Sequence, residues 1–367
     1  MNQIPVNSLL RHVKPVESLL ANAAAEVLKS GYFVLGPSVS AFEREFADYC
    51  GTAFCVSVAN GTDALEISLR SLGISEGDKV AVCANAAMYG TSAVMACGAI
   101  PVFVDVDASY GLMDVNQLTA ICASDQKPIA VILTHLYGRL GNVEAVSAIC
   151  RENGILLVED CAQAHGAQLE DGRKAGSFGD AAAFSFYPTK NLGAVGDGGA
   201  IITNSVDTAE RARKLRQYGW TSKYSNGIAG GRNSRLDEIQ AKMLTVMLPM
   251  LDGWNDRRRE IANRYSVEIQ NPALQLPPVS GREYVAHLYV VQCRQRDRMR
   301  SHLAAAGIQT DVHYPIPDHR QQCHAGRFEK VILPVAEELS KTVLTLPCFP
   351  ELTDAEVQQV VDACNAF

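Results

Sequence analysis

Apolar residues follow two alternating patterns along the chain. Short, mostly apolar runs, typical of buried strands, occur at residues 54–59, 79–83, 101–106, 129–134, 155–159, 181–186 and 200–203. Between them, apolar residues spaced three and four positions apart indicate helices at residues 16–29, 38–49, 62–72, 89–97, 115–122, 143–152 and 207–218. Strands that alternate with helices form βαβ units, so the pattern predicts an α/β fold with a mostly parallel central sheet.

The pattern changes in the last third of the chain. A long helix over residues 236–248 should break at Pro249, and a second helix covers residues 254–269. A strand at 287–293, a helix at 298–306, an extended stretch at 309–314 and a helix at 354–364 follow. We therefore predict a large α/β domain over residues 1–248 and a smaller α+β domain over residues 249–367. Residues 222–231, rich in Ser, Asn and Gly, should form a mobile loop.

Composition narrows the class of protein. The chain has 367 residues, 47% of them hydrophobic and 20% charged, as in an ordinary globular protein. A net charge of −7 argues against a nucleic-acid binder, and no apolar run is long enough for a membrane span or a signal peptide. Eleven cysteines without a CxxC pair are best explained as free thiols in a reducing cytoplasm. His313, His319, Cys323 and His324 match no familiar zinc spacing, so we expect no metal.

One lysine stands out. Lys190 lies between the strands predicted at residues 181–186 and 200–203, in a stretch crowded with glycines and small polar residues. A lysine held in a tight turn beside apolar strands is desolvated, which favours the neutral amine that a Schiff-base lysine needs. A solvated lysine in a hairpin loop is the alternative.

Two further features follow predicted strands. Gly61 and Thr62 open a helix after one strand, where free backbone N–H groups can bind an anion, although simple helix capping by Thr62 or Asp63 explains them equally well. Asp160 follows another strand, where it can cap the next segment or face a cationic nitrogen. An anion site, an aspartate and an imine lysine are together what pyridoxal phosphate requires.

Several motifs resemble those of one family, the DegT/DnrJ/EryC1/StrS sugar aminotransferases of the pyridoxal-phosphate-dependent fold type I. The resemblance covers nearly the whole chain. Its landmarks are Gly36-Pro37, Asn60-Gly61-Thr62-Asp63, Pro101-Val102-Phe103, His135-Leu136-Tyr137-Gly138, Glu159-Asp160-Cys161-Ala162-Gln163, Phe184-Ser185-Phe186-Tyr187-Pro188-Thr189-Lys190-Asn191 and Asn233-Ser234-Arg235. It implies the aspartate-aminotransferase-like architecture, with a mostly parallel sheet and a smaller C-terminal domain.

The resemblance also assigns roles. It implies that Lys190 binds the cofactor covalently and shuttles protons, that Asp160 pairs with the pyridinium nitrogen, and that Gln163 bonds the ring oxygen. Tyr187 is expected to join Lys190 and Asp160 as a catalytic residue. The other cofactor contacts expected are Gly61, Thr62, the backbone of Asp63, Ser185, Asn233 from a second subunit, and Tyr89 stacked on the ring, with Met88 as an alternative.

The implied reaction moves an amino group from glutamate to a keto group of a nucleotide-linked sugar, through the pyridoxamine form of the cofactor. Tyr187, where members acting at C4 often have histidine, favours C3, most plausibly on a dTDP-linked keto-deoxy sugar, in amino-sugar biosynthesis for a surface polysaccharide or a natural product. The expected substrate contacts are His313, Tyr314, Arg235 and Lys223, with Arg232 and Arg320 as further candidates for the diphosphate.

Alternatives remain open at this point. They are amination at C4 or C2, another fold type I enzyme, and a regulator that binds the cofactor without turnover. A sugar dehydratase of the same family would have histidine in place of Lys190. Asn233 predicts a homodimer with shared active sites, because it follows a glycine-rich loop that has little apolar surface of its own; an ordinary helix N-cap is the alternative.

Overall fold

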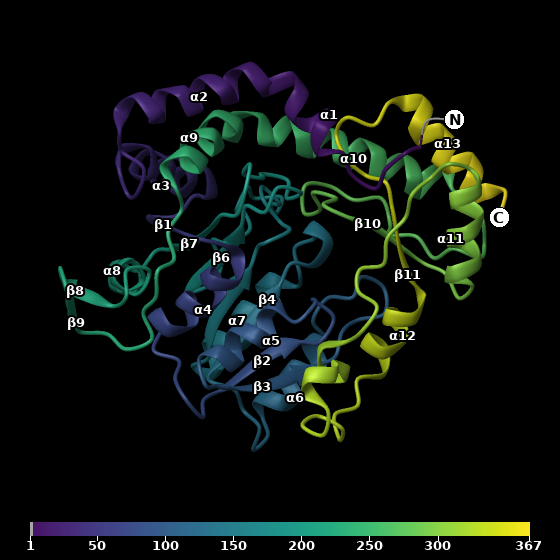
Figure 1. Ribbon diagram of the computed structural model, residues 1–367. Coiled ribbons are helices and arrows are strands. Elements are labelled where there is room, and N and C mark those ends of the chain that lie inside the picture. Colours follow the sequence, from purple (N-terminus) through teal and green to yellow (C-terminus); the bar gives the residue numbers. More distant parts are fainter. Residues whose placement is uncertain (1–2) are drawn as a thin grey trace.

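The computed structural model, which describes residues 3–367, has a seven-stranded sheet at its centre (Figure 1). The strands lie in the order β1-β7-β6-β5-β4-β2-β3, and five of them, from β6 to β3, are parallel. β7 is antiparallel to both β1 and β6, so the predicted, mostly parallel sheet is confirmed. The bounds are Phe54–Val58 for β1, Lys79–Cys83 for β2, Ile100–Val104 for β3, Ala130–Thr134 for β4, Leu156–Asp160 for β5, Ala181–Ser185 for β6 and Gly199–Thr203 for β7.

Helices connect these strands and cover both faces of the sheet. The α-helices of this part of the chain are α1 (Leu9–Val13), α2 (Glu17–Ser30), α3 (Pro37–Cys50), α4 (Gly61–Ser71), α5 (Tyr89–Ala96), α6 (Val115–Cys122), α7 (Val143–Asn153), α8 (Val206–Leu215) and α9 (Glu238–Met247). Because alternate residues of a strand point to opposite faces, neighbours on β6 enter different cores. Ala182 and Phe184 pack with α3 and α9, whereas Ala181 and Ala183 pack with α4 and α8.

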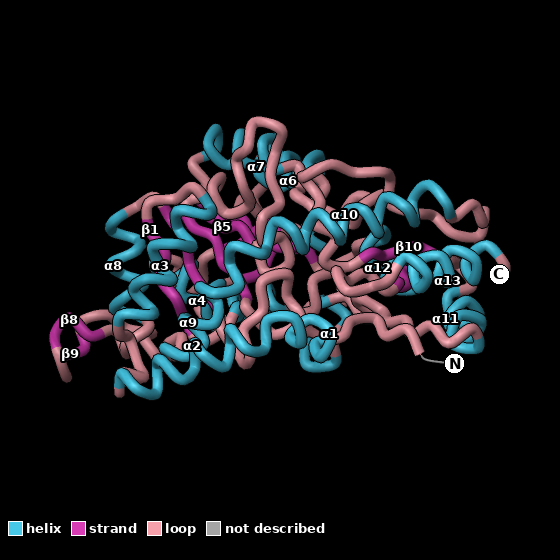
Figure 2. The backbone as a smooth tube through the Cα atoms, turned by 90° about the horizontal axis from the view of Figure 1, so that it is seen from above, coloured by secondary structure: helices cyan, strands magenta, loops and turns pink. Residues whose placement is uncertain are grey.

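A second core lies near the C-terminal end of the chain. It is built by α10 (Leu251–Glu268), α11 (Arg296–Ala305), α13 (Asp354–Asn365) and the antiparallel pair β10 (Tyr289–Gln292) and β11 (Val343–Leu346). Ile4, from the opposite end of the sequence, is buried in the same core and bridges to Ile308. Figure 2 shows both ends of the chain on this side of the molecule. The division at residue 248 stays a prediction.

The structure corrects several predicted elements. The long helix begins at Glu238 rather than near residue 236, its N-cap is Asp237, and Asn233 caps no helix. The predicted break at Pro249 is confirmed: α9 ends at Met247, Pro249 lies in the first turn of a short 3-10 helix, Leu248–Met250, where no amide hydrogen is needed, and the next α-helix begins at Leu251. The helix predicted at residues 38–49 begins at Pro37: the N-cap of α3 is Gly36, and the carboxylate of Glu238 accepts the N–H groups of Gly36, Ser38 and Val39.

Two regions contain more regular secondary structure than the sequence pattern predicts. The predicted loop at residues 222–231 contains part of a hairpin, β8 (Trp220–Ser222) and β9 (Ser225–Asn226), which extends away from the rest of the molecule (Figures 1 and 2). The second region holds α12 (Pro334–Thr342) and β11, which the sequence pattern does not predict because the short strand follows the helix with no turn residue between them.

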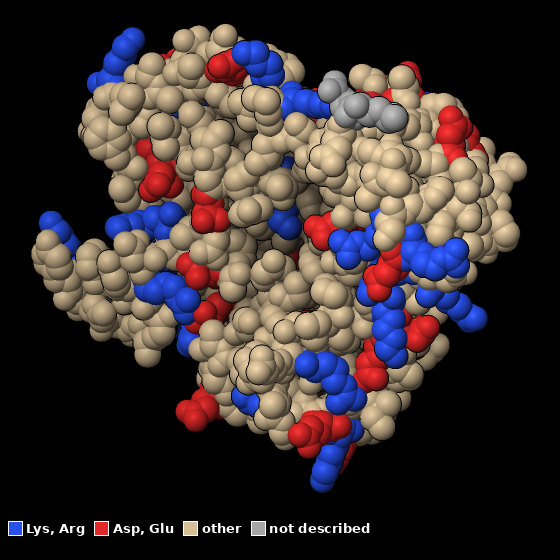
Figure 3. Space-filling view, turned by 45° about the vertical axis from the view of Figure 1, so that its right-hand side comes forward, with Lys and Arg blue, Asp and Glu red and all other residues tan. Residues whose placement is uncertain are grey.

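On the face seen in Figure 3, basic and acidic side chains are interspersed, and the surface is hollowed near its middle. Among the described residues, no helix is both long and apolar enough to cross a membrane.

Candidate active site

Lys190 lies in a tight turn that follows β6. Its N–H donates to the carbonyl of Tyr187 at 2.8 Å, and the N–H of Ala194 donates to the carbonyl of Phe186 at 2.7 Å. Gly193 is required here, since a Cβ would lie 2.4 Å from the carbonyl oxygen of Pro188. Burial lowers the pKa of Lys190 to about 8, and the nearby carboxylate of Asp160 opposes this shift. Lys190 is only partly exposed, and its pKa is shifted in the direction that favours the neutral amine.

Asp160 is the last residue of β5, beside β6, and is 4% exposed. Burial raises the pKa of its carboxyl group; the N–H of Ala162, at 3.1 Å, and the charge of Lys190 oppose the rise. Its second oxygen, Oδ2, accepts only a long hydrogen bond of 3.4 Å from the hydroxyl of Thr134, as far as the described residues go. A buried carboxylate oxygen so weakly satisfied is well suited to a cationic partner.

The start of α4 faces the end of β6. Gly61 lies so close to Ser185 that a Cβ on the glycine would be 2.6 Å from the serine Cβ. Asn60 caps the helix: its side chain accepts the N–H of Asp63 at 2.8 Å, and its carbonyl accepts that of Ala64. Asp63, expected to offer its N–H to the phosphate, is thus already bonded. The N–H groups of Gly61 and Thr62 remain for an anion, beside the hydroxyl of Ser185.

A segment from the C-terminal part of the chain closes the other side. The Gln163 side chain accepts the N–H of Tyr137 at 2.6 Å and donates to the hydroxyl of Tyr314 at 3.0 Å, which leaves its second amide hydrogen for a ligand. Burial lowers the pKa of His313; the carboxylate of Asp311 opposes this shift, and the charge of Lys190 adds to it. The structure therefore brings His313 and Tyr314, predicted from distant sequence, to Lys190 and Asp160.

The aromatic candidates differ in their surroundings. Tyr89 is the first residue of α5, is 49% exposed, and lies close enough to Tyr314 to influence its pKa. Tyr187 is 52% exposed and immediately precedes the lysine turn. Both side chains are thus exposed enough to contact a ligand.

These residues fit pyridoxal phosphate. The cofactor carries an aldehyde, a protonated ring nitrogen and a phosphate. Lys190, the under-satisfied oxygen of Asp160 and the start of α4 match these three groups in chemistry, and the near contact of Gly61 with Ser185 makes a cradle that a side chain would fill.

The comparisons with known proteins agree. The family model for the DegT/DnrJ/EryC1/StrS aminotransferase family matches residues 16–365. The chain belongs to this family. It is 43% identical over 359 residues to a dTDP-3-amino-3,6-dideoxy-alpha-D-galactopyranose transaminase of Aneurinibacillus thermoaerophilus, covering 98% of this chain and 96% of that protein. It is 38% identical to a UDP-N-acetyl-3-dehydro-alpha-D-glucosamine 3-aminotransferase of Acidithiobacillus ferrooxidans, covering 97% of this chain and 96% of that one.

A solved crystal structure, that of S. venezuelae DesV, superposes with a TM-score of 0.95 at 40% identity, covering 100% of this chain and 98% of that one. The predicted family and fold are therefore confirmed.

Two of the remaining predicted residues of this aminotransferase are already ion-paired. Arg232 forms ion pairs with Asp63 and Glu66, and Arg320 pairs with Glu337 at 2.8 Å. Arg235 is partly buried, and Lys223 and Asn233 are exposed, Lys223 on the projecting hairpin (Figure 1). Within one subunit, the structure does not bring Lys223 into contact with the residues described above.

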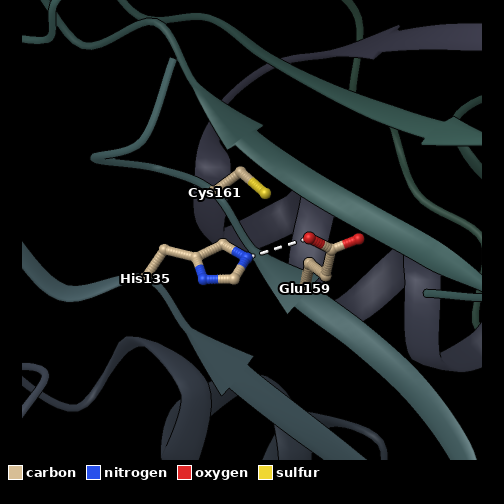
Figure 4. Close-up of side chains that lie close together, drawn as sticks. All are labelled: His135, Glu159 and Cys161. Carbon is tan, nitrogen blue, oxygen red and sulfur yellow. Dashed lines mark hydrogen bonds and ion pairs between the residues drawn. The ribbon is translucent and has the colours of Figure 1, made fainter. Parts of the chain in front are cut away.

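Three buried side chains, His135, Glu159 and Cys161, lie as close together as the ligands of a metal site (Figure 4). Hydrogen bonds explain the arrangement of the first two. His135 accepts the N–H of Gly141 at Nδ1, so its proton is on Nε2 and is donated to Glu159 at 2.9 Å. The Glu159 carboxylate also accepts the N–H groups of Gly176, Phe178 and Gly179, at 2.8 to 2.9 Å. Burial raises the pKa of the third member, Cys161, which disfavours the thiolate that a metal needs.

Sequence reasoning missed the buried amide network that holds the lysine turn. Asn191 donates to Asn255 at 2.7 Å and to the carbonyl of Val285 at 3.1 Å, so its oxygen accepts the Nδ1 proton of His287. Burial, reinforced by the charge of Lys190, holds the pKa of His287 well below its ordinary value. Three of these residues are distant in sequence, and the only available signal was the position of Asn191 directly after the lysine.

Proposed function

We propose that this aminotransferase moves an amino group from glutamate to the C3 keto group of a dTDP-linked keto-deoxy sugar. The observation that carries the proposal is the arrangement of Lys190 with the under-satisfied Asp160 at the ends of adjacent strands, beside the start of α4. The cofactor is pyridoxal phosphate, as in related family members.

Each residue has a defined task. When bound, the cofactor supplies an electron sink that stabilises negative charge on the substrate carbon. Asp160 holds a proton on the ring nitrogen, because a buried carboxylate favours a charged partner. The Lys190 amine removes a proton at one carbon and returns it at another, which its pKa of about 8 permits near neutral pH. Gly61, Thr62 and Ser185 bind the phosphate, and Gln163 orients the ring through its free amide hydrogen.

Two observations support amination at C3. Tyr187 precedes the lysine turn and is exposed towards solvent, where it can contact a sugar. The relatives named above aminate C3, one on a dTDP sugar and the other on a UDP sugar. We choose dTDP because the relative with higher identity carries that nucleotide. His313 and Tyr314 are the proposed contacts on the substrate side.

The substrate proposal is tested with a panel of dTDP- and UDP-linked 3-keto and 4-keto sugars, with glutamate as donor and product regiochemistry by NMR. We expect turnover on a dTDP-linked 3-keto-6-deoxyhexose. Amination at C4, or activity only on UDP sugars, would refute the specific substrate. Cofactor binding without turnover on any of these sugars, or on free oxo-acids, would instead favour the regulator.

We also propose a homodimer with shared active sites. Asn233 is exposed beside the projecting hairpin. Its neighbour Arg232 connects this segment to α4 through ion pairs with Asp63 and Glu66. Exposed apolar side chains follow α2 in sequence, namely Tyr32, Phe33 and Val34, with 62, 53 and 46% exposure. A contiguous exposed apolar stretch of this kind favours coverage by another chain.

Subunit mixing tests the dimer. Lys190→Ala and Asn233→Ala proteins, each inactive, are combined. Shared sites should regain up to about half activity per heterodimer, since one of two sites is then intact. A fully active monomer at assay concentration would exclude the shared site.

A further inference from the structure

Two segments that are more than 200 residues apart in sequence meet beside the active site. The first is the turn at residues 84–88, between β2 and α5, which leads into Tyr89. The second is the segment of residues 313–320, which carries His313 and Tyr314. Asp318 joins them: its N–H donates to the carbonyl of Ala84 at 2.7 Å.

The Asp318 side chain makes the stronger connection. One carboxylate oxygen accepts the N–H of Met88 at 2.9 Å, and the other accepts the hydroxyl of Thr91 at 2.6 Å. Asp318 is 0% exposed. Hydrogen bonds to a buried carboxylate are charge-assisted, and a donor left without it would be buried and unsatisfied.

The turn that Asp318 holds is strained. Ala87 and Met88 have φ angles of 55° and 69°, in the left-handed region that residues with a Cβ rarely adopt. Two such residues in succession cost free energy and persist only where surrounding contacts impose them. The hydrogen bond from Met88 to Asp318 is such a contact, and it acts on the residue directly before Tyr89.

We propose that Asp318 is a positioning residue that fixes Tyr89 in the cofactor site and ties the substrate-side segment to it. The inference rests on the proposed function and on the expectation, from the sequence, that Tyr89 stacks on the cofactor ring. Tyr314, four residues before Asp318, is bonded to Gln163. One carboxylate thus sets the relative position of an aromatic residue for the cofactor and a segment for the substrate.

A merely structural role would lower stability without changing cofactor binding, and the chain offers a matched control. Asp105 is also a buried carboxylate that joins distant segments: it accepts the N–H groups of Val335 and Ala336 at the start of α12, at 3.0 and 2.9 Å. It does not bond the turn at residues 84–88. Asp318→Asn and Asp105→Asn should therefore both lower the melting temperature, and only the first should weaken cofactor binding.

The experiment measures the Kd of pyridoxal phosphate by fluorescence quenching, with visible circular dichroism of the bound cofactor as a second readout. We expect Asp318→Asn to raise the Kd about tenfold and to change the dichroic signal, as loss of one good hydrogen bond implies. Thr91→Val, which removes one partner only, should have a smaller effect in the same direction and serves if Asp318→Asn does not fold.

A double mutant tests whether Asp318 affects cofactor binding through Tyr89. In a Tyr89→Ala background, Asp318→Asn should change the Kd less than twofold, because the residue that it positions is gone. A full tenfold effect in that background, or a wild-type Kd and dichroic signal in both the Asp318→Asn and Thr91→Val single variants, would overturn the inference. These binding measurements need no sugar substrate, so failure of the substrate proposal is detected separately by the activity panel.

Discussion

Two neighbouring carboxylates at the end of β5, on opposite faces of the strand, differ in how fully they are hydrogen-bonded. Glu159 is fully buried and accepts hydrogen bonds from His135 and three backbone N–H groups. Asp160, one residue on, points to the opposite face, where one backbone N–H and a long bond from Thr134 leave it under-satisfied beside Lys190. The saturated carboxylate holds the fold together, whereas the under-satisfied one is available to a ligand. Sequence proximity alone does not separate these roles.

The largest effect is expected on the Asp160 side. Lys190→Ala should reduce transamination at least about a thousandfold, because no other group on this face supplies the covalent attachment and the proton transfer. Borohydride treatment of the wild-type protein with pyridoxal phosphate should label Lys190, as peptide mass spectrometry would show. Lys174, which packs over the ring of Tyr49, is the control position, and labelling there would contradict the assignment.

Asp160→Asn should reduce the rate at least about a hundredfold, on the order of 3 kcal/mol of barrier, since a neutral amide does not favour a protonated ring nitrogen. The variant should still bind the cofactor through the phosphate site. Steady-state kinetics with glutamate measure the effect, and near-normal turnover would remove Asp160 from the mechanism.

Glu159→Gln tests the other side of the comparison. The amide replaces an acceptor by a donor that faces backbone N–H groups, so the free energy of unfolding should fall by about 2 to 4 kcal/mol. Urea denaturation measures this loss, with Glu144→Gln as a surface control expected to cost less than about 1 kcal/mol. Folded Glu159→Gln protein should keep most of its rate per site. A large kinetic defect at unchanged stability would reverse the distinction between the two carboxylates.

The smallest effect concerns pH. Cofactor capture needs the neutral amine, and at pH 7 only about a tenth of a group with a pKa of about 8 is neutral. The rate of capture by the cofactor-free protein should rise about tenfold per unit below pH 8 and level off above it.

The pH dependence of cofactor capture also distinguishes Asp160 from Glu159. Asp160 favours the charged lysine, so Asp160→Asn should move the inflection to lower pH. Glu159→Gln should leave it in place. Stopped-flow absorbance at several pH values records both profiles, and an unmoved inflection in Asp160→Asn would show that the two charges are not coupled.

Much of the sheet and part of the site were predictable. The parallel strands are apolar runs covered on both faces, so β2, β4 and β5 were found within a residue or two of their ends. The placement of Lys190 and Asp160 at the ends of adjacent strands was predictable, because parallel strands present their carboxyl ends at one edge; their roles stay a prediction. The hairpin β8–β9 was not found, because its strands are only three and two residues long and mostly exposed. The pair α12–β11 was not found, because the strand follows the helix with no turn residue between them.

By itself, the sequence determined the order of most strands and helices along the chain, the family, and the candidate residues for the cofactor's functional groups, because these depend on local patterns and side-chain chemistry. Only the tertiary structure decided which buried groups are already satisfied. The Glu159 carboxylate accepts backbone N–H groups of residues 176, 178 and 179. The N–H of Asp63 donates to Asn60, and its carboxylate pairs with Arg232. The N–H of Met88 donates to Asp318. The physical reason is that a hydrogen bond depends on distance and direction between groups that the chain brings together only when it folds.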